Sequence, residues 1–382
     1  MSDNNKENNI KVFQFSKLTP EPKFEVVRNK KWMDFGKDNL LPEYIKELLD
    51  DSPAHAAIVA GTATFVSGEG WEIPDSPSAQ LQAFFDNKDP KEEEQNNLDD
   101  VLRMVAMDLK TYGAFALNVR WSVDGKNIGA VHHIDVSKIR LATNTGSKLP
   151  HYYVCADWSN TRKNVPKIYQ GYSVLNRKER SQILYVKLPN PKNPPYGMPD
   201  YWAAREAIEI DQSIQEFQLR RLKEGFFPSV IITVPSLAES QLEQDKMYDE
   251  LKDFFGGNSG AAAIMDGEYK FEKFEPSSVP DDFMQFQRNV NQKIKEAHRV
   301  PAKGQLFGLS DESGGMTFSN EQLLNEFELF NQTIVRSYQR VIEDTFNKLA
   351  KQNGISEQMR ITKYALNLDP EQENNNEESN IE

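Results

Sequence analysis

The chain is organised around two stretches, YGMPDYWAAREAIEIDQSIQEFQLRRLKEG at positions 196–225 and PDDFMQFQRNVNQKIKEAHRVP at positions 280–301. Each is predicted to form a long helix. The first is expected to begin near Asp200, whose carboxylate can accept a hydrogen bond from a free amide, and to end at Gly225. Pro301 stops the second, because the residue before a proline disfavours helical geometry.

Apolar side chains recur at three- and four-residue intervals along both helices, which places them on one face of each. In the first helix they are Ala203, Ala207, Ile210, Ile214 and Phe217. In the second they are Phe283, Phe286, Val290, Ile294 and Ala297. The first helix is about 36 Å long at 1.5 Å per residue. Two long helices with narrow apolar stripes lie on either side of a small insert in the sequence. This arrangement predicts a stalk of two helices that carries a small compact unit at its end.

The insert at 226–278 is predicted to be a compact unit of strands and one helix. Its elements are a strand at 226–234, a helix at 237–255 with a capping box of Ser236 and Glu239, and strands at 261–265 and 269–274. The Asp266-Gly267 dipeptide between the last two strands is a hairpin signal.

Residues 25–195 are predicted to form an α+β domain. Helices are expected around 40–49, 53–68, 81–85 and 98–112, with Ser52 and Asn97 as N-caps. From residue 114 the apolar period changes toward two, and short strands are expected at 115–121, 129–135, 139–142, 152–158 and 183–187. These strands predict a small, mostly antiparallel sheet packed on the helices.

A glycine-rich segment with few apolar anchors follows the second long helix, at 301–318, and a loop of this length is more often functional than accidental. Ser319 with Gln322 then caps a further helix that runs to about residue 351. Its apolar stripe consists of Leu323, Phe327, Phe330, Ile334, Tyr338, Val341 and Phe346. The first 20 residues and the acidic last dozen are expected to be disordered.

The length, charge and cysteine content limit the classes of protein to which the chain can belong. With 382 residues, 38% of them hydrophobic, the chain is long enough for two or three domains. A net charge of -13 argues against a protein that coats nucleic acid, because non-specific binding depends on basic side chains that displace counterions. The single Cys155 excludes an internal disulfide and is expected to be a small core residue. No signal peptide or membrane span is expected, which predicts a cytoplasmic site of synthesis.

Candidate catalytic groups are sparse. His132 and His133 point to opposite faces of a strand, so they cannot share a metal through that strand alone. His133 and Asp135 share a face, yet no third ligand follows at a fixed spacing. No nucleophile, base and orienting group present themselves, although spatial triads can hide in a sequence. A metal-dependent enzyme acting on nucleic acid or phosphate therefore remains the alternative interpretation.

Three basic residues, Lys295, Arg299 and Lys303, cluster where the second long helix enters the glycine-rich segment. Cations at a helix C-terminus stabilise its dipole by a few tenths of a kcal/mol, roughly, which accounts for them without any ligand. The alternative is a local contact with a phosphate-bearing partner on an otherwise acidic chain. Both interpretations stay open at this point.

Several segments, in order, resemble the tailed-bacteriophage portal proteins of the HK97-like type. They are NLLPEY at 39–44, SPAHAAI at 52–58, SGEGW at 67–71, PYGMPDYW at 195–202, FPSVIITV at 227–234, MDGEYKFE at 265–272, and the run 286–301 with the glycine-rich segment behind it. The resemblance covers about residues 36–350. No single motif is diagnostic, and the specificity lies in their order.

The resemblance implies an α+β portal fold and a ring oligomer, usually of twelve copies. Its implied parts are a flexible arm (1–24), an α/β wing (25–200), stem helix 1 (201–225), a small α/β clip (226–279), stem helix 2 (280–300), a tunnel loop (301–319), a long wing helix (320–352) and a short C-terminal segment with a disordered acidic tail (353–382). Little or no crown is expected. In such a ring each narrow apolar stripe can meet a neighbouring copy.

The resemblance also implies positions for contacts. The candidates for the DNA channel or tunnel loop are Lys295, Arg299, Lys303, Gly304, Gln305, Ser310, Gly314 and Gly315. The candidates for docking at the clip are Glu239, Asp245, Asp249, Lys252, Asp266, Glu268 and Lys270. An acidic lining with sparse basic positions would let duplex DNA slide without adhesion.

The implied function is structural. Such a ring occupies one capsid vertex of the virion, passes double-stranded DNA non-specifically, and docks the large terminase and then a head-tail adaptor beside the major capsid protein. Assembly takes place in the host cytoplasm. No catalytic residue, metal, cofactor or membrane contact is expected. A different head-tail ring component is a further alternative.

Overall fold

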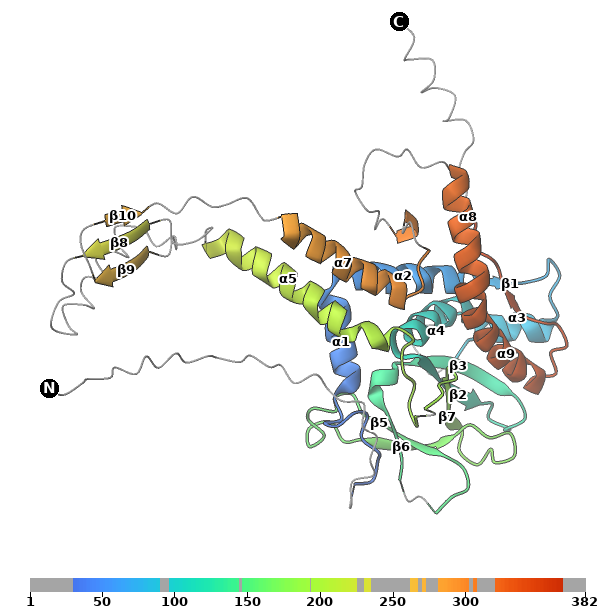
Figure 1. Cartoon of the computed structure of the whole chain (residues 1–382). Helices are drawn as coiled ribbons and strands as arrows, with labels where there is room; N and C mark the ends of the chain where they lie inside the picture. The colour runs from blue at the N-terminus through green and yellow to red at the C-terminus, as the bar shows by residue number, and fades with distance from the viewer. Residues whose placement is uncertain are drawn as a thin grey trace, which may run out of the picture.

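The computed structural model describes most of the chain. For the described residues between 220 and 284 and for Gln305, only the backbone is described. The described ranges are 30–89, 96–143, 146–192, 194–224, 230–234, 262–266, 270–272, 281–301, 305–307 and 320–366. Figure 1 shows a body of helices and one large sheet, from which a pair of helices, α5 (Arg205–Glu224) and α7 (Asp281–Ala297), projects toward a separate small sheet. The predicted arm (1–24) and the acidic tail lie outside the described residues.

Two helices in series begin the body, α1 (Leu41–Asp51) and α2 (Pro53–Ser67). The Ser52 hydroxyl accepts a hydrogen bond of 3.3 Å from an amide of the first turn of α2, which confirms the predicted N-cap. Gly68 ends α2 with φ at +56°, and a Cβ there would lie 2.0 Å from the carbonyl oxygen of Thr362. Glycine is therefore required where the C-terminal segment passes.

The next elements are β1 (Trp71–Glu72), α3 (Ala79–Asp86) and α4 (Leu98–Tyr112). The Asn97 side chain accepts a hydrogen bond from the Asp100 amide at 2.9 Å, and the Asp100 carboxylate accepts one from the Asn97 amide at 3.2 Å. The predicted cap is thus confirmed, as half of a reciprocal capping box. No helix in the described ranges is both long and apolar enough to cross a bilayer.

The large sheet has six strands in the order β3-β2-β7-β6-β5-β4, antiparallel apart from the β6 and β7 pair. The strands are β2 (Ala114–Trp121), β3 (Ile128–Ile134), β4 (Ile139–Leu141), β5 (His151–Val154), β6 (Lys167–Gly171) and β7 (Ser181–Lys187). A short 3-10 turn, η1 (Val136–Lys138), joins β3 to β4. The prediction of a small, mostly antiparallel sheet is confirmed.

Two details of the sheet differ from the prediction. The strand predicted at 152–158 ends at Val154, because the partner strand β4 begins only at Ile139, after the η1 turn. The Cys155 amide still bonds the Lys138 carbonyl at 3.0 Å. Cys155 is buried, as expected of a small core residue. Strand β6 was not predicted, since its sequence KIYQG contains only two apolar side chains and does not alternate.

Both edges of the sheet are occupied within the chain. At the β3 edge, the Asn353 side-chain amide pairs with both backbone groups of Ile128, at 2.7 and 3.0 Å, and Asn87 does the same for Val131, at 2.8 Å each. At the β4 edge, the segment 31–33 bonds the strand and its flank. These positions are therefore closed to pairing with another chain.

Two apolar clusters hold the body together. The first packs α4 and the C-terminal helices on one face of the sheet, with Val101, Val105, Leu109, Phe115, Leu117, Phe346 and Leu349 at its centre. The second joins α1 and α2 to the inner ends of α5 and α7, through Ile45, Leu48, Ile58, Ile208, Ile214, Val290 and Ile294. Each such side chain contributes roughly 1.5–3 kcal/mol on burial. The second cluster anchors the projecting pair.

The predicted stripe on the first long helix is buried only in part. Ala207 and Ile214 are buried, whereas Ile210 is 39% exposed and Phe217 46% exposed. Phe286 of α7 is 48% exposed. The α5 and α7 pair therefore carries apolar surface that its own body leaves uncovered.

The helix predicted at 320–351 has three parts, α8 (Asn320–Phe330), the π turn η4 (Asn331–Val335) and α9 (Arg336–Gln352). A π turn contains more residues per turn than an α-helix, which shifts the phase of the apolar stripe between the two halves. Phe330, Ile334 and Tyr338 are all buried against the body. Beyond α9, β11 (Arg360–Ile361) pairs with β1. This pairing was not predicted from two-residue strands.

The small sheet consists of β8 (Val230–Val234), β9 (Ala262–Asp266) and β10 (Lys270–Glu272) in the order β10-β8-β9. The predicted hairpin of the last two strands is wrong, because β8 lies between them. Strand β9 runs parallel to β8, and β10 runs antiparallel along the other edge of β8. The helix predicted at 237–255 lies outside the described residues.

Candidate functional site

Three charged side chains from distant parts of the chain meet where α5 and α7 join the body. The Nζ atom of Lys110, near the end of α4, lies 3.0 Å from Oδ1 of Asp200, and Nη2 of Arg299 lies 2.5 Å from Oδ2. The Lys110 side chain is fully buried, whereas that of Arg299 is 53% exposed. One carboxylate thus holds an enclosed cation and a solvent-facing cation.

Opposing effects act on the protonation of this group. Burial raises the pKa of Asp200, but Lys110 and the hydrogen bonds to the carboxylate outweigh it, so the pKa is lowered. Burial lowers the pKa of Lys110, and Asp200 offsets part of that effect. The Lys110 Nζ atom also lies 5.7 Å from the ring centroids of both Tyr201 and Tyr338. The enclosed charges therefore depend on one another.

The predicted capping role of Asp200 is wrong. The 3-10 turn η2 (Trp202–Ala204) precedes α5, and its N-cap position is Tyr201, without a side-chain cap. The Asp200 carboxylate instead makes two charge-assisted contacts, which are roughly twice as strong as a neutral hydrogen bond. The cations thus outcompete a free amide.

Arg299 adopts a backbone conformation that normally favours glycine, with φ at +58°. Its amide bonds the Glu296 carbonyl at 3.0 Å, and the Val300 amide bonds the Lys295 carbonyl at 3.0 Å. This pair of bonds is a Schellman ending of α7, with arginine at the left-handed position. An L side chain there costs about 1 kcal/mol relative to glycine, and the ion pair with Asp200 offsets that cost.

Two histidines lie against the charged group. Nδ1 of His55 and Nε2 of His298 are 2.9 Å apart, and both side chains are fully buried. The Tyr201 ring packs on both, with centroid distances of 4.5 and 4.7 Å. Burial, and then Lys110, lowers the pKa of His55 to about 3 and that of His298 well below its usual value. Both rings are therefore neutral at neutral pH.

The candidate channel residues fall into three groups. Lys295 is buried, at 3% exposure, and Arg299 is bound to Asp200. Gln305 belongs to the 3-10 turn η3 (Gln305–Phe307), where only its backbone is described. The remaining candidates lie outside the described residues: Lys303, Gly304, Ser310, Gly314 and Gly315.

The candidate docking residues lie in or near the small sheet. Asp266 ends β9 opposite Val234, and Lys270 begins β10 opposite Thr233, so both lie at the same end of the small sheet. The other candidates lie outside the described residues: Glu239, Asp245, Asp249, Lys252 and Glu268.

The glycine-rich segment has an apolar anchor that the prediction did not assign. The ring of Phe307 lies 5.8 Å from that of Phe65 and 5.5 Å from that of Phe330, between centroids. A Cβ atom at Gly61 of α2 would lie only 2.6 Å from the Phe307 ring. The Phe307 ring therefore packs against α2 in the space that the missing side chain of Gly61 leaves, and this contact holds the turn at 305–307 on α2.

The histidines and the carboxylate considered for metal or acid-base chemistry do not converge. His132 contacts Asp89 at 3.2 Å and His133 contacts Asp108 at 2.7 Å, whereas Asp135 binds Lys46. The two histidines have different partners, as expected of neighbours on a strand. Across the part of the chain that the structure describes, no three His, Cys, Asp or Glu side chains are grouped for a metal ion.

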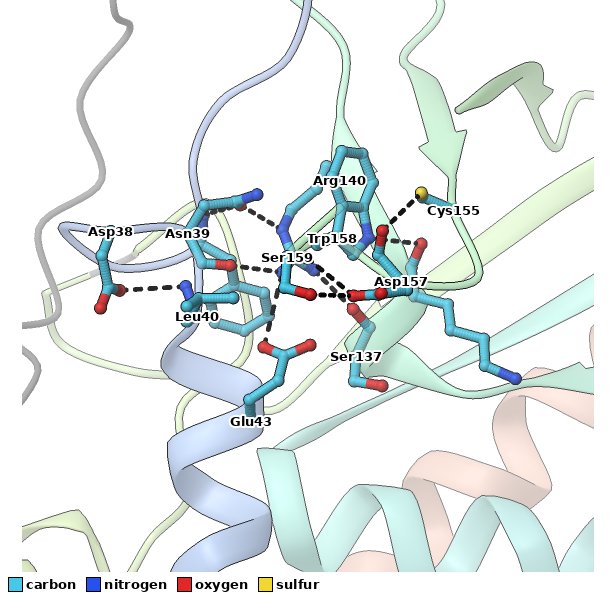
Figure 2. A network of polar contacts seen from close by, with 12 residues as sticks. Asp38, Asn39, Leu40, Glu43, Ser137, Arg140, Cys155, Asp157, Trp158 and Ser159 are labelled. Carbon is cyan, nitrogen blue, oxygen red and sulfur yellow. Dashed lines mark hydrogen bonds and ion pairs between the residues drawn. The ribbon is translucent and has the colours of Figure 1, made fainter. Parts of the chain in front are cut away.

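A second polar cluster surrounds Arg140, which is fully buried (Figure 2). Its Nε atom bonds the Asn39 side chain, its Nη2 atom bonds the Asn39 carbonyl at 2.7 Å, and Nη1 bonds the Ser137 carbonyl at 2.6 Å. Its guanidinium lies 4.8 Å from the Trp158 ring centroid, and a Glu43 carboxylate oxygen is 3.9 Å away. Since its donors are used internally, this arginine ties α1 to the sheet rather than holding a ligand.

Sequence reasoning missed the enclosed members of the charged group. Lys110 follows Leu102 and Ala106 at four-residue spacing, so a lysine in phase with the apolar stripe of α4 was the available signal. His298 likewise follows Ile294 by four residues. Neither spacing identifies the residue that each side chain contacts in the folded chain, because Asp200 is 90 residues from Lys110.

Comparison with known families gives one match over most of the chain. The family model described as phage portal protein matches residues 92–375. A curated relative, an uncharacterized protein of Rickettsia bellii (strain RML369-C), is 25% identical over 173 residues, which are 44% of this chain. The chain spans 43% of that relative's length.

Solved structures share the fold at low sequence identity. The virion of a native gene transfer agent particle contains a chain with a TM-score of 0.56 and 11% identity, covering 84% of this chain and 83% of that one. The neck of that particle type, computed with C12 symmetry, gives 0.56 and 12%, covering 86% and 84%. An HK97 family phage portal protein from Corynebacterium diphtheriae gives 0.51 and 11%, covering 79% and 89%.

Proposed function

Because the chain belongs to the phage portal protein family, we propose that its copies close a ring at one capsid vertex, through which double-stranded DNA is packaged and ejected. A dodecamer is the expected size, in keeping with the C12 symmetry used for a neck structure of similar fold. The ring is a component of the virion and assembles in the host cytoplasm. It has no catalytic turnover of its own.

The parts of the ring follow the architecture in Figure 1. The body at 25–200 is the wing, α5 and α7 are the stem within 201–225 and 280–300, and the small sheet belongs to the clip at 226–279. The tunnel loop is 301–319, and 320–352 is the long wing helix. A projecting helix pair that separates a large body from a small sheet supports this division.

The observation that carries the proposal is the exposed apolar surface of α5 and α7. Ile210 of α5 is 39% exposed and Phe286 of α7 is 48% exposed, so the projecting pair presents apolar side chains to solvent. An adjoining side of α5, with Ala207 and Ile214, is already buried against the body. Exposed apolar surface on a projecting pair of helices is typical of an interface, and in a closed ring the neighbouring copy covers it.

Partners beyond the ring follow from the same function. The clip docks the large terminase during packaging and a head-tail adaptor afterwards, and the wing meets the major capsid protein. DNA passes without sequence-specific contact, consistent with the net charge of -13.

Assembly is the test. Purified protein is examined by light scattering and by electron microscopy over a range of protein concentrations and salt. Particles of about twelve times the chain mass, with a central hole, are expected. A strict monomer under every condition would refute the proposal.

A further inference from the structure

Arg299 differs from an ordinary salt-bridged arginine because its partner, Asp200, also pairs with a second cation, Lys110. Asp200 binds Lys110 through Oδ1 and Arg299 through Oδ2, so the two cations do not compete for one oxygen. When Arg299 leaves, Asp200 remains paired with a fully buried lysine. No uncompensated charge is then left in the interior.

The exposure of the Arg299 side chain also allows its guanidinium to separate from Asp200. Its side chain is 53% exposed, whereas that of Lys110 is fully buried and packed near the rings of Tyr201 and Tyr338. The backbone of Arg299 is held by the Schellman bonds at the end of α7, so the guanidinium can change partner without unwinding the helix. Residue 301 follows two positions later, at the start of the proposed tunnel loop.

We propose that Arg299 exchanges between Asp200 and a phosphate of the DNA backbone. A guanidinium binds carboxylate and phosphate with the same planar, bidentate geometry, so the two anions are interchangeable ligands. Asp200 holds the side chain when no DNA is present and takes it back as DNA moves on. Such a contact is weak and repeated in every copy, which allows DNA to slide.

The inference rests on the proposed ring and assigns one DNA-contacting residue within it. The ligand chemistry favours DNA over a neighbouring copy's carboxylate, because the exchange requires an anion that arrives and departs. A carboxylate in a permanent interface would hold Arg299 continuously. The loss of Arg299 distinguishes the two ligands. It weakens DNA binding if the ligand is a DNA phosphate, and ring assembly if the ligand is a carboxylate of a neighbouring copy.

The test uses assembled rings and a short DNA duplex, with binding measured from low to moderate salt. Arg299→Gly removes the guanidinium and suits the left-handed backbone. Each phosphate contact removed makes the slope of log affinity against log salt shallower by about 0.9, and every copy in the ring carries the substitution, so a slope shallower by about 0.9 or more is expected. Arg162→Gly, which removes another exposed arginine, is the matched control and leaves the slope unchanged.

A second variant releases the arginine instead of removing it. Lys110→Met with Asp200→Asn removes both enclosed charges together, so Arg299 loses its internal partner while the interior stays neutral. DNA affinity is expected to rise above that of the unaltered protein. Adding Arg299→Gly to this double variant abolishes the gain.

Three results would overturn the exchange. One is an unchanged slope of log affinity against log salt in Arg299→Gly rings, with only a lower melting temperature, which would show that the ion pair only stabilises the fold. Another is weaker ring assembly with an unchanged slope, which makes a neighbouring carboxylate the ligand. The third is absence of rings in the unaltered protein, which refutes the proposed function itself, whereas the first two leave it standing.

Discussion

Lys110 has its charge fully buried at the end of α4, and the carboxylate of Asp200 is its ion-pair partner. Burying an ammonium without a partner is far more unfavourable than leaving it in water. The aromatic rings of Tyr201 and Tyr338 supply additional favourable contact with the cation. One unpaired charge is therefore unfavourable at the junction of the body and the projecting helices, so the two charges must be kept or removed together.

Replacing one member of this pair tests the dependence. Lys110→Met should lower the free energy of unfolding by about 3 kcal/mol, the low end for breaking a buried pair, because Arg299 still neutralises Asp200. Urea unfolding measures the change. Lys348→Met, at an exposed position of α9, serves as the control and should stay within about 0.5 kcal/mol of the unaltered protein. Equal effects of the two substitutions would contradict the pairing.

His55 and His298 give the fold a pH dependence with a defined sign. Both rings are neutral in the folded chain because burial, and then the nearby Lys110, lowers their pKa values. In the unfolded chain the pKa is about 6.5. The unfolded state therefore binds more protons below that pH, and stability is lost as the pH falls from about 6.5 toward 3.

Each histidine contributes a slope of up to about 1.4 kcal/mol per pH unit in this window. His298→Gln should remove about half of the combined slope, measured by urea unfolding at several pH values between 6.5 and 4. His151→Gln is the control, since His151 lies only partly buried at the start of β5. Parallel pH profiles for His298→Gln and the unaltered protein would show that these rings do not titrate on unfolding.

At the scale of elements, η3 is attached to α2 through a glycine and a phenylalanine. Gly61 lies inside α2, where alanine would be the better helix former by about 1 kcal/mol. Its missing side chain admits the Phe307 ring, which a Cβ atom would meet at 2.6 Å. The packing of the turn therefore outweighs helix propensity at this position.

A double-mutant cycle separates the two effects. Gly61→Ala in the unaltered protein should be destabilising by about 1 kcal/mol, because overpacking costs about 1–3 kcal/mol. In a Phe307→Ala background the same change should be stabilising by up to about 1 kcal/mol, since only helix propensity remains. Urea unfolding of the four proteins measures the coupling. The same sign in both backgrounds would refute the contact.

At the scale of the whole molecule, exposed apolar side chains on the projecting helices favour association of copies. Ile210 of α5 is 39% exposed and Phe286 of α7 is 48% exposed. Because both face solvent in one copy, replacing them should have little effect on folding.

Ile210→Ser with Phe286→Ser should leave the melting temperature nearly unchanged and weaken each interface by about 1–2 kcal/mol, which raises the protein concentration needed for ring assembly about five- to thirtyfold. Analytical ultracentrifugation measures the shift. Leu175→Ser removes an even more exposed apolar side chain, at 98%, on a loop of the body and should leave assembly unchanged. Rings that assemble normally in the double variant would place the interface elsewhere.

Local signals predicted the fold well where the interaction is local. The Ser52 and Asn97 caps act on amides three residues away, and the period-two runs gave most strands of the large sheet. Prediction failed where the partner is distant. The turn at Asp266-Gly267 looked like a hairpin, but β8 takes the place between the two strands it connects.

By itself, the sequence determined the order of most helices and strands, the acidic balance and the two long helices within 196–225 and 280–301, because these depend on periodicity and neighbours within a few residues. Only the tertiary structure decided that α5 buries part of its apolar stripe and exposes the rest, and that Lys110, Asp200 and Arg299 form one group. Burial and ion pairing depend on which distant surfaces meet. That information is carried by the packed core and by no short stretch of the chain.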